Sequence, residues 1–521
     1  MADIILISPR FKNHFWGMEL AMPLAGKRAS LPQTCLPLLA ALTPAGHRLT
    51  LIDENIEDID YERCRRADIV GVTGMSVQRF QMRHILGELK KRGCFTVVGG
   101  PWVTAREDYF GGLADVVFVG EADDSWPRFL GEWQEGRPAG RYEQPEKSDM
   151  TKSPVPRFDL LKTRHYIFGT LQFSRGCPHQ CEFCDIIVIF GRRPRYKTPG
   201  QVVAEMEAAR RSGQRLIFVV DDNLICDRAA AKAILTEMIL WQQRNGYPLA
   251  MITQATLDLS DEPELMRLMV EANFIALFIG VESPNEESLQ ETGKWHNLRN
   301  GRPLMGKLRR IQEVGFVIWC GMIQGFDHDD AGIFRSQLEF LTRGRIPVVM
   351  SGMLTAIPKT PLYDRLAREG RIDPADPPRF GTNVVPARMS GEELRDGYVW
   401  LHAALYNPQS GLGRLDALFL DPEFEVGFAR QGNYWRRHRW LRLRRETGYA
   451  FKAAGLFVRL MIRVPDASLR REYFRRVARL LKVHRRPGLV LNYLLHIDVL
   501  YHAGELAKRM ADGRLPALNT Y

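Results

Sequence analysis

Short apolar runs alternate with helical patterns twice along this chain, and this alternation limits the fold more than any other feature. In residues 1–140 the pattern predicts a parallel, doubly wound α/β sheet of Rossmann type, which binds ligands at the carboxyl ends of its strands. The five predicted strands are DIILIS, HRLTLID, ADIVGVTG, FTVVGG and ADVVFVG.

Glycines follow several of these strands, at the edge where such a sheet binds ligands. Gly74, Gly99, Gly100 and Gly120 are the candidates. A glycine lets a ligand approach the backbone closely, although turns from strand to helix need glycine as well. On its own, this segment indicates a nucleotide- or cofactor-binding module.

Residues 141–165 are polar and contain prolines, which is typical of a linker. Residues 166–387 repeat the alternation with six further strands. Six βα units are too few for a closed eight-stranded barrel, so we expect a partial (β/α)6 barrel with its active site at the carboxyl ends of the strands. Residues 388–521 are predicted to be helical.

The positive charge is concentrated near the C-terminus. Residues 431–490 carry 17 Lys and Arg against three acids, and the rest of the chain therefore sums to about −3 of the total +11. Residues 468–483 predict an amphipathic helix. We expect this segment to make peripheral contact with an anionic membrane surface. The alternative is that its arginines pair with acids of the first two segments while the helix packs its apolar side inward. No RNA-binding signature is present, and no nucleic acid partner is expected.

The remaining features predict a cytoplasmic protein. Apolar residues make up 45% and charged residues 26% of the chain. The N-terminus, MADIILISPR, lacks the pattern of a signal peptide, and no apolar run reaches the roughly 18 residues needed to cross a bilayer. The eight cysteines are sparse, which fits a reducing compartment.

Three of the cysteines lie in FSRGCPHQCEFCDI, in the loop that leaves the first predicted barrel strand. An odd triplet does not form disulfide pairs, and structural zinc usually needs four ligands, for which His179 is a candidate. Thiolates also hold iron–sulfur clusters, and three of them leave one iron of a four-iron cluster open to a cofactor. Cys226 and Cys320 are expected to be buried apolar thiols that the cluster does not need.

Several motifs point to one family. SRGCPHQCEFC resembles the cluster loop of the radical S-adenosylmethionine (SAM) superfamily, whose fold is a partial barrel. GRRPRYKT, FVVDDN, FIGVESPNEESL, GMIQGF and AIPKTPLY resemble the subgroup with an N-terminal cobalamin domain. VTGMSV, VVGGP and VFVGEAD resemble the turns of that domain, so the resemblance covers nearly the whole chain.

The resemblance implies three cofactors: a [4Fe–4S] cluster, SAM and cobalamin. The implied contacts are Cys177, Cys181 and Cys184 for the cluster, Glu282 for SAM, and Phe183, Gly321, Ile323 and Gly325 near adenine. It also implies that the cluster passes one electron from a flavodoxin or ferredoxin to SAM, which yields a 5′-deoxyadenosyl radical. For Asp221 and Asp222, solvated or helix-capping roles compete with cofactor contacts.

The motif D-x-H-x-x-G, which supplies a histidine to cobalt in many corrinoid proteins, is absent from the sequence. The loop after the first strand is SPRFKN instead. We therefore expect cobalamin to bind without a histidine below the cobalt. His47 precedes a strand and His84 lies in a predicted helix, so both are expected to be ordinary histidines.

The motifs PVPRFDLL and CEFCDII resemble the hopanoid C-methylases and bacteriochlorophyll side-chain methylases. The resemblance implies a C-methyltransferase for a large apolar substrate, such as a hopanoid-like lipid or a tetrapyrrole. An oxidative cyclase of tetrapyrrole biosynthesis shares these motifs and is the alternative. An RNA-modifying methylthiotransferase is disfavoured because Cys35, Cys64 and Cys94 do not form a second triplet. A corrinoid sensor is disfavoured because it has no need for SAM cleavage.

Overall fold

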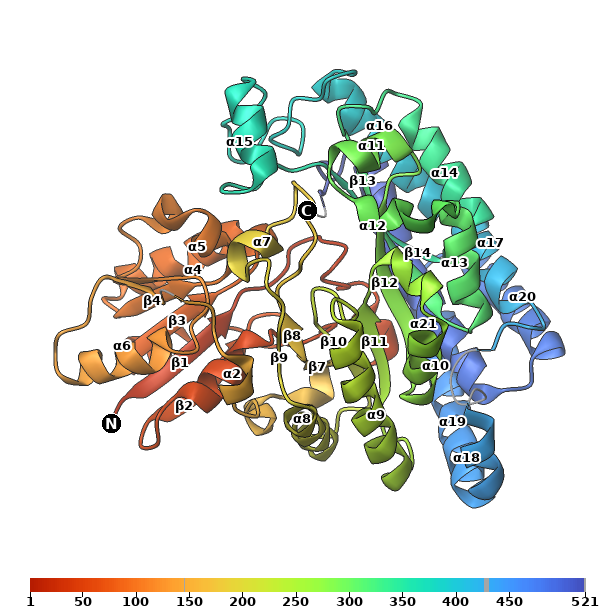
Figure 1. Cartoon of the computed structure of the whole chain (residues 1–521), viewed down its shortest axis with the longest axis horizontal. Helices are drawn as coiled ribbons and strands as arrows, with labels where there is room; N and C mark the ends of the chain where they lie inside the picture. Colours follow the sequence, from red (N-terminus) through yellow and green to blue (C-terminus); the bar gives the residue numbers. More distant parts are fainter. Residues whose placement is uncertain (145, 426–430, 520–521) are drawn as a thin grey trace.

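Two six-stranded parallel sheets form the framework of the computed structural model, which describes residues 1–144, 146–425 and 431–519 (Figure 1). The first sheet has the strand order β2-β1-β3-β4-β5-β6. Its strands are β1 (Asp3–Ser8), β2 (Arg48–Asp53), β3 (Ile69–Thr73), β4 (Thr96–Gly99), β5 (Val116–Val119) and β6 (Arg141–Glu143).

Both faces of the first sheet are buried, as a doubly wound fold requires. Successive side chains of a strand point to opposite faces. Ile4 packs in one core with α2 (Cys35–Leu42) and α6 (Ser125–Gln134), and Ile5 packs in the other with α3 (Tyr61–Arg66) and α4 (Arg79–Lys91). The prediction of a doubly wound sheet is therefore confirmed.

The segment predicted to be a linker begins with a sixth strand, β6. Its central residue, Tyr142, is buried and stacks on Phe118 of β5, with the ring centroids 5.3 Å apart. A three-residue strand with one buried side chain has too little periodicity to be recognised in the sequence.

The second sheet is an open barrel in which each strand pairs in parallel with its neighbours. Its strand order is β14-β13-β12-β11-β10-β7, so the predicted partial barrel of six strands is confirmed. The strands are β7 (Gly169–Leu171), β10 (Leu216–Val219), β11 (Ala250–Gln254), β12 (Phe274–Glu282), β13 (Val317–Gln324) and β14 (Val348–Met353).

Helices precede or follow each barrel strand, and some of them begin with a side-chain cap. In α8 (Pro199–Arg211), Thr198 and Gln201 form a capping box, and Pro199 occupies the first turn. The other outer helices are α9 (Arg228–Arg244), α10 (Pro263–Glu271), α13 (Leu304–Glu313) and α14 (Ile333–Arg343).

The C-terminal region is helical, as predicted. It comprises α16 (Gly391–Tyr406), α17 (Pro408–Phe419), α18 (Gly432–Arg437), α19 (Arg439–Arg463), α20 (Ala467–Val483) and α21 (Pro487–Ala511). α20 is the predicted amphipathic helix, but its Tyr473, Val477 and Leu480 are buried, so it packs its apolar side inward. The part of the chain that the structure describes has no helix long and apolar enough to cross a membrane.

The carboxyl ends of the two sheets meet at a buried group of charges. Arg175 lies in β8 (Ser174–Arg175), which pairs with β9 (Arg195–Tyr196). Arg175 Nη1 lies 2.7 Å from both the Glu121 and Asp123 carboxylates after β5, and Arg195 Nη1 lies 2.9 Å from Glu121. Nearby, α5 (Pro101–Ala105) contacts α7 (Ile186–Ile189).

We expect Glu121→Ala to destabilise the joint between the sheets. The change leaves Arg175 without one of its two carboxylate partners and Arg195 without its carboxylate, so the free energy of unfolding should fall by about 3–5 kcal/mol. Thermal and urea unfolding followed by circular dichroism measure the loss. The control is Glu135→Ala, which removes an exposed ion pair with Arg137 worth about 1 kcal/mol or less. Equal stability of the two variants would contradict the assigned role of Glu121.

Candidate functional site

The three cysteines lie in a tight loop between β8 and α7. The loop begins at Gly176, whose φ of 94° favours glycine. A side chain there would lie 3.0 Å from the carbonyl oxygens of Gly191 and Arg193. The Gly176 N–H donates to Asp222 at 2.9 Å, and the Cys177 N–H donates to the Gly191 carbonyl at 3.3 Å. The backbone of the loop is therefore held closed.

Asp221 is buried, so a solvated role is wrong for it, whereas Asp222 is half-buried. Asp221 accepts from the Phe173 N–H at 2.7 Å and from the Ser174 hydroxyl at 2.6 Å. Burial raises the pKa of Asp221 to about 6. Both carboxylates bind the chain just before the cysteines and fix where the loop leaves the strand.

The thiols differ in their surroundings. Cys181 is 8% exposed, and Cys177 and Cys184 are half-buried. A hydrogen bond from the Cys226 thiol lowers the pKa of Cys177 to about 7, whereas burial raises the pKa of Cys181 and of Cys184. Cys226 was expected to be a buried apolar thiol, but it is half-buried and lies beside Cys177. Cys320 is buried, as expected.

The donor set suits an iron–sulfur cluster better than a zinc ion. His179, the candidate fourth zinc ligand, stacks on the ring of His296 with the centroids 3.9 Å apart. Among the described residues, no group of three or more His, Cys, Asp or Glu side chains has the spacing of a single-ion site. Three thiols from one loop are the donor set that leaves one iron of a four-iron cluster open to a cofactor.

Glu282 ends β12 with a strained backbone beside the cysteine loop. Its φ of 69° is unusual for a residue with a side chain and is stabilised by the surrounding structure. The carboxylate is buried and accepts a hydrogen bond from Lys294. Its second oxygen, Oε2, has no partner among the described residues. A buried carboxylate oxygen without a partner fits a site that binds an amine.

Lys294 was not identified from the sequence. It is buried, pairs with Glu282, and its Nζ lies 5.7 Å from the centroid of the Phe183 ring. The preceding residue, Gly293, has a φ of 71°, and a side chain there would lie 2.7 Å from the Gln180 carbonyl oxygen. The turn before Lys294 therefore fits directly against the cysteine loop. The glycine before the lysine is the signal that the sequence offered.

The predicted adenine contacts lie mostly at this same end of the barrel. Phe183 packs beside Ile323 and the Phe326 ring, whose centroid is 6.0 Å away. Gly325 follows β13 with a φ of 97°, and a side chain there would lie 3.0 Å from Leu394. Gly321 is different because it lies within β13, paired with β12 and β14.

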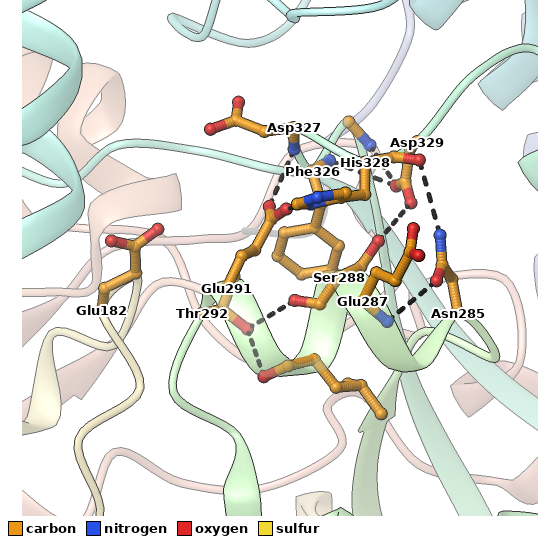
Figure 2. A network of polar contacts seen from close by, with 12 residues as sticks. Glu182, Asn285, Glu287, Ser288, Glu291, Thr292, Phe326, Asp327, His328 and Asp329 are labelled. Carbon is orange, nitrogen blue, oxygen red and sulfur yellow. Dashed lines mark hydrogen bonds and ion pairs between the residues drawn. The ribbon is translucent and has the colours of Figure 1, made fainter.

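A network of polar contacts holds the loops of the site together (Figure 2). The Glu182 N–H donates to the Thr292 carbonyl at 3.0 Å, which ties the cysteine loop to the end of α11 (Glu286–Glu291). Asp329 accepts from the Ser288 hydroxyl at 2.8 Å and from the Gly325 N–H at 3.0 Å. Arg365 of α15 (Pro361–Arg368) pairs with Glu182 at 2.7 Å. The loops after β8, β12 and β13 therefore support one another.

Two of the four predicted glycines of the first sheet form a close backbone contact. Gly100 has a φ of 111° and a ψ of −179°, which only glycine adopts readily, and a side chain there would lie 2.9 Å from the Gly74 carbonyl oxygen. A side chain at Gly99 would lie 3.2 Å from Phe118. Gly120 has a φ of 76° and open space around it, and it precedes Glu121. Neighbouring protein atoms therefore account for glycine at positions 74, 99 and 100, whereas Gly120 leaves its backbone open to a ligand.

The histidines near the first sheet do not point to its carboxyl edge. His47 precedes β2 and accepts from the Ala2 N–H at 3.3 Å, and His84 is exposed on α4. His14 follows the loop after β1, and its Nε2 lies 3.2 Å from the Asn519 carbonyl oxygen. In the loop after β1, the Pro9 carbonyl accepts a hydrogen bond from the side chain of Gln78.

The sequence matches two family models. Residues 171–331 match the Radical SAM superfamily, and residues 360–514 match a domain of unknown function (DUF4070). An uncharacterized methyltransferase of Synechocystis is 37% identical over 80% of this chain and 78% of its own. The hopanoid C-2 methylase of Rhodopseudomonas palustris is 35% identical over 71% of each chain.

The fold of the whole chain resembles that of a solved structure. The cobalamin-dependent SAM radical enzyme OxsB, with aqua-cobalamin and SAM bound, superposes with a TM-score of 0.60. The alignment covers 99% of this chain and 81% of OxsB at 13% identity. At that identity the comparison shows the fold alone.

We expect Cys177→Ala/Cys181→Ala/Cys184→Ala to abolish iron binding, because the loop then offers no thiolate. Iron and sulfide analysis of anaerobically prepared protein, with the visible absorption spectrum, provides the measurement. Cys320→Ala, which removes a buried thiol from the same barrel, is the control and should keep four irons per chain. A triple variant that retains four irons would show that other residues hold the cluster.

We expect Glu282→Gln to weaken SAM binding about 10- to 100-fold without loss of iron. A charge-assisted hydrogen bond contributes about 1.5–3 kcal/mol, and every 1.4 kcal/mol is tenfold in Kd. Equilibrium dialysis of the anaerobic protein with labelled SAM measures the Kd. Glu286→Gln, an exposed neighbour at the start of α11, is the matched control. Unchanged affinity in Glu282→Gln would remove Glu282 from the SAM site.

Proposed function

The chain belongs to the radical SAM methyltransferase family that includes hopanoid C-2 methylase, and on this basis we propose that it methylates an unactivated carbon of a large apolar substrate with the help of cobalamin. When bound, the cluster, SAM and cobalamin supply radical formation and a transferable methyl group. The protein's own part is to bind, orient and shield these groups.

One observation carries the proposal. The cysteine loop starts directly after Arg175, and Arg175 pairs with Glu121 at the carboxyl edge of the first sheet. The loop that would hold the cluster and the edge that would hold cobalamin therefore face the same region. A methyl transfer that uses both groups on one substrate requires this arrangement.

The residues of the barrel have separate tasks in this proposal. Cys177, Cys181 and Cys184 hold the cluster. The buried Oε2 of Glu282 accepts the amine of SAM, while Lys294 pairs with that carboxylate and holds it in place. Phe183 and the cluster of apolar side chains around Ile323, together with the backbone of Gly321 and Gly325, enclose adenine.

The first sheet contributes a surface of backbone. We propose that cobalamin approaches the ends of β3, β4 and β5, where Gly120 has open space around it and Gly74, Gly99 and Gly100 allow the tight packing of the turns. His14 follows the loop after β1, and both of its ring nitrogens lie 3.2 Å from backbone groups, of Asn519 and of Trp16, so we propose that no histidine of this loop ligates cobalt. This agrees with the absence of D-x-H-x-x-G from the sequence.

We propose the substrate and the partners only as chemical classes. Hopanoid C-2 methylase, by its name, acts on a hopanoid, and we propose an apolar molecule of that size class, a polycyclic lipid or a tetrapyrrole. A flavodoxin or ferredoxin supplies the single electron, and an anionic membrane surface provides access to the apolar substrate. No nucleic acid partner is proposed.

Product analysis separates methylation from oxidative cyclisation. Anaerobic enzyme with SAM, cobalamin, a one-electron reductant and an apolar extract should form both S-adenosylhomocysteine and 5′-deoxyadenosine. The product should gain the mass of a methyl group in place of hydrogen. Formation of 5′-deoxyadenosine alone, with an oxidised and unmethylated product, would replace the proposal with the cyclase alternative.

A further inference from the structure

A cavity lies at the end of the barrel opposite the cysteine loop. It has a volume of about 1120 Å³ and is lined by the starts of barrel strands, among them Gly169, Leu216 and Ala250. The active site of such a barrel lies at the other, carboxyl ends of its strands. α19 and the start of α21 form the opposite wall, and Figure 1 shows α18 and α19 at the lower right, far from α7 and α15. This cavity is separate from the site described above.

The wall of this cavity is strongly basic. Ten Lys and Arg residues line it, against one acid, Glu446, among the residues that the structure describes. Three of the ten pair with carboxylates: Arg210 with Glu207, Arg442 with Glu446 and Arg486 with Glu425. Others bond to backbone carbonyls, as Arg459 does to Leu24 and Lys27 does to Arg164. Carbonyl contacts do not neutralise the charge, so a net positive field remains.

Like charges face one another within the cavity. Burial and the charges of Arg215 and Arg445 lower the pKa of Lys452. Burial and the charge of Lys452 lower the pKa of Lys27 in turn. These residues come from different parts of the fold, so their proximity is a product of the tertiary structure. An anion among them would relieve the repulsion.

The outer face of α19 is apolar and exposed. Trp440, Leu443, Phe451, Val458 and Ile462 are between 51% and 84% exposed. Their spacing of three, eight, seven and four residues places them on one side of the helix. The inner side, with Leu456 and Leu460, is buried. A helix of 25 residues is about 37 Å long, and this apolar stripe follows most of it.

The stripe and the cavity meet. Phe451 belongs to the stripe and also lines the cavity, next to Lys452. Arg444, Lys452 and Arg459 follow one edge of the stripe at helical spacing and line the cavity as well. A long helix with apolar and aromatic side chains on one face and Lys or Arg beside it is typical of helices that lie in a membrane interface.

We propose that α19 docks on an anionic phospholipid membrane, with the apolar stripe in the acyl boundary and a lipid phosphate at the cavity mouth beside Arg444 and Lys452. The alignment of the stripe with the basic edge favours a lipid over a nucleic acid, because bases stack on aromatic rings but would not cover the exposed aliphatic side chains of Val458 and Ile462. This docking specifies which helix makes the membrane contact of the proposed function, and it rests on that function. Its test involves no turnover, so docking and methyl transfer can fail separately.

Flotation of the full-length protein with vesicles tests the docking. Binding to vesicles of equal parts phosphatidylcholine and phosphatidylglycerol should exceed binding to pure phosphatidylcholine at least tenfold, and should weaken with salt. Arg444→Glu/Lys452→Glu should reduce the partition coefficient at least about tenfold. Phe451→Asp/Ile462→Asp should reduce it similarly. Arg66→Glu/Val385→Asp changes an exposed cation and an exposed apolar residue elsewhere and should bind as wild type does.

Titration calorimetry with soluble ligands tests the cavity mouth. Short-chain phosphatidylglycerol should bind to wild type and at least about tenfold more weakly to Arg444→Glu/Lys452→Glu. Inorganic phosphate that binds as tightly as the lipid would identify a free anion as the ligand and overturn the lipid assignment. Four other results would overturn membrane docking. Two of them are equal flotation with neutral and anionic vesicles and no flotation at all. The other two are RNA binding that the Phe451→Asp/Ile462→Asp variant retains and a dimer in light scattering that this variant dissociates.

Discussion

The carboxylate of Glu121, buried between the guanidinium groups of Arg175 and Arg195, determines how the two sheets meet. Removal of these charges from water is costly, and only their mutual pairing offsets it. The end of β5 and the β8–β9 pair are thereby fixed against each other. Because Cys177 follows Arg175 by two residues, the same contact sets where the cysteine loop lies. The two ligand-binding edges face each other as a result.

Most of the framework could be predicted because the strand and helix periods are local properties of the sequence. The buried runs of β12 and β13 are examples. β6 was missed because only Tyr142 and its contact with Phe118 make it a strand. α20 was recognised as an amphipathic helix, but the direction of its apolar face depends on packing against other C-terminal helices. Local sequence does not contain that information.

Some residues of the candidate site could also be predicted from local sequence, and others could not. The cysteine triplet and Glu282 could be identified because each lies within a short motif of fixed spacing. Lys294 and Cys226 could not, because they approach the cysteine loop from other βα units. A lysine in a polar loop normally extends into water, and only the tertiary structure buries Lys294 beside Glu282. The exposed stripe of α19 was likewise visible only when its buried face was known.

The central claim is that the cobalamin edge and the cysteine loop share one site. Electron paramagnetic resonance tests it most directly. The enzyme carries both cobalamin and the iron–sulfur cluster and is reduced so that cob(II)alamin and the cluster are both paramagnetic. The account predicts that the two spins interact, so that both signals broaden or split relative to protein that carries only one of the groups. Two signals that add without any change would contradict it.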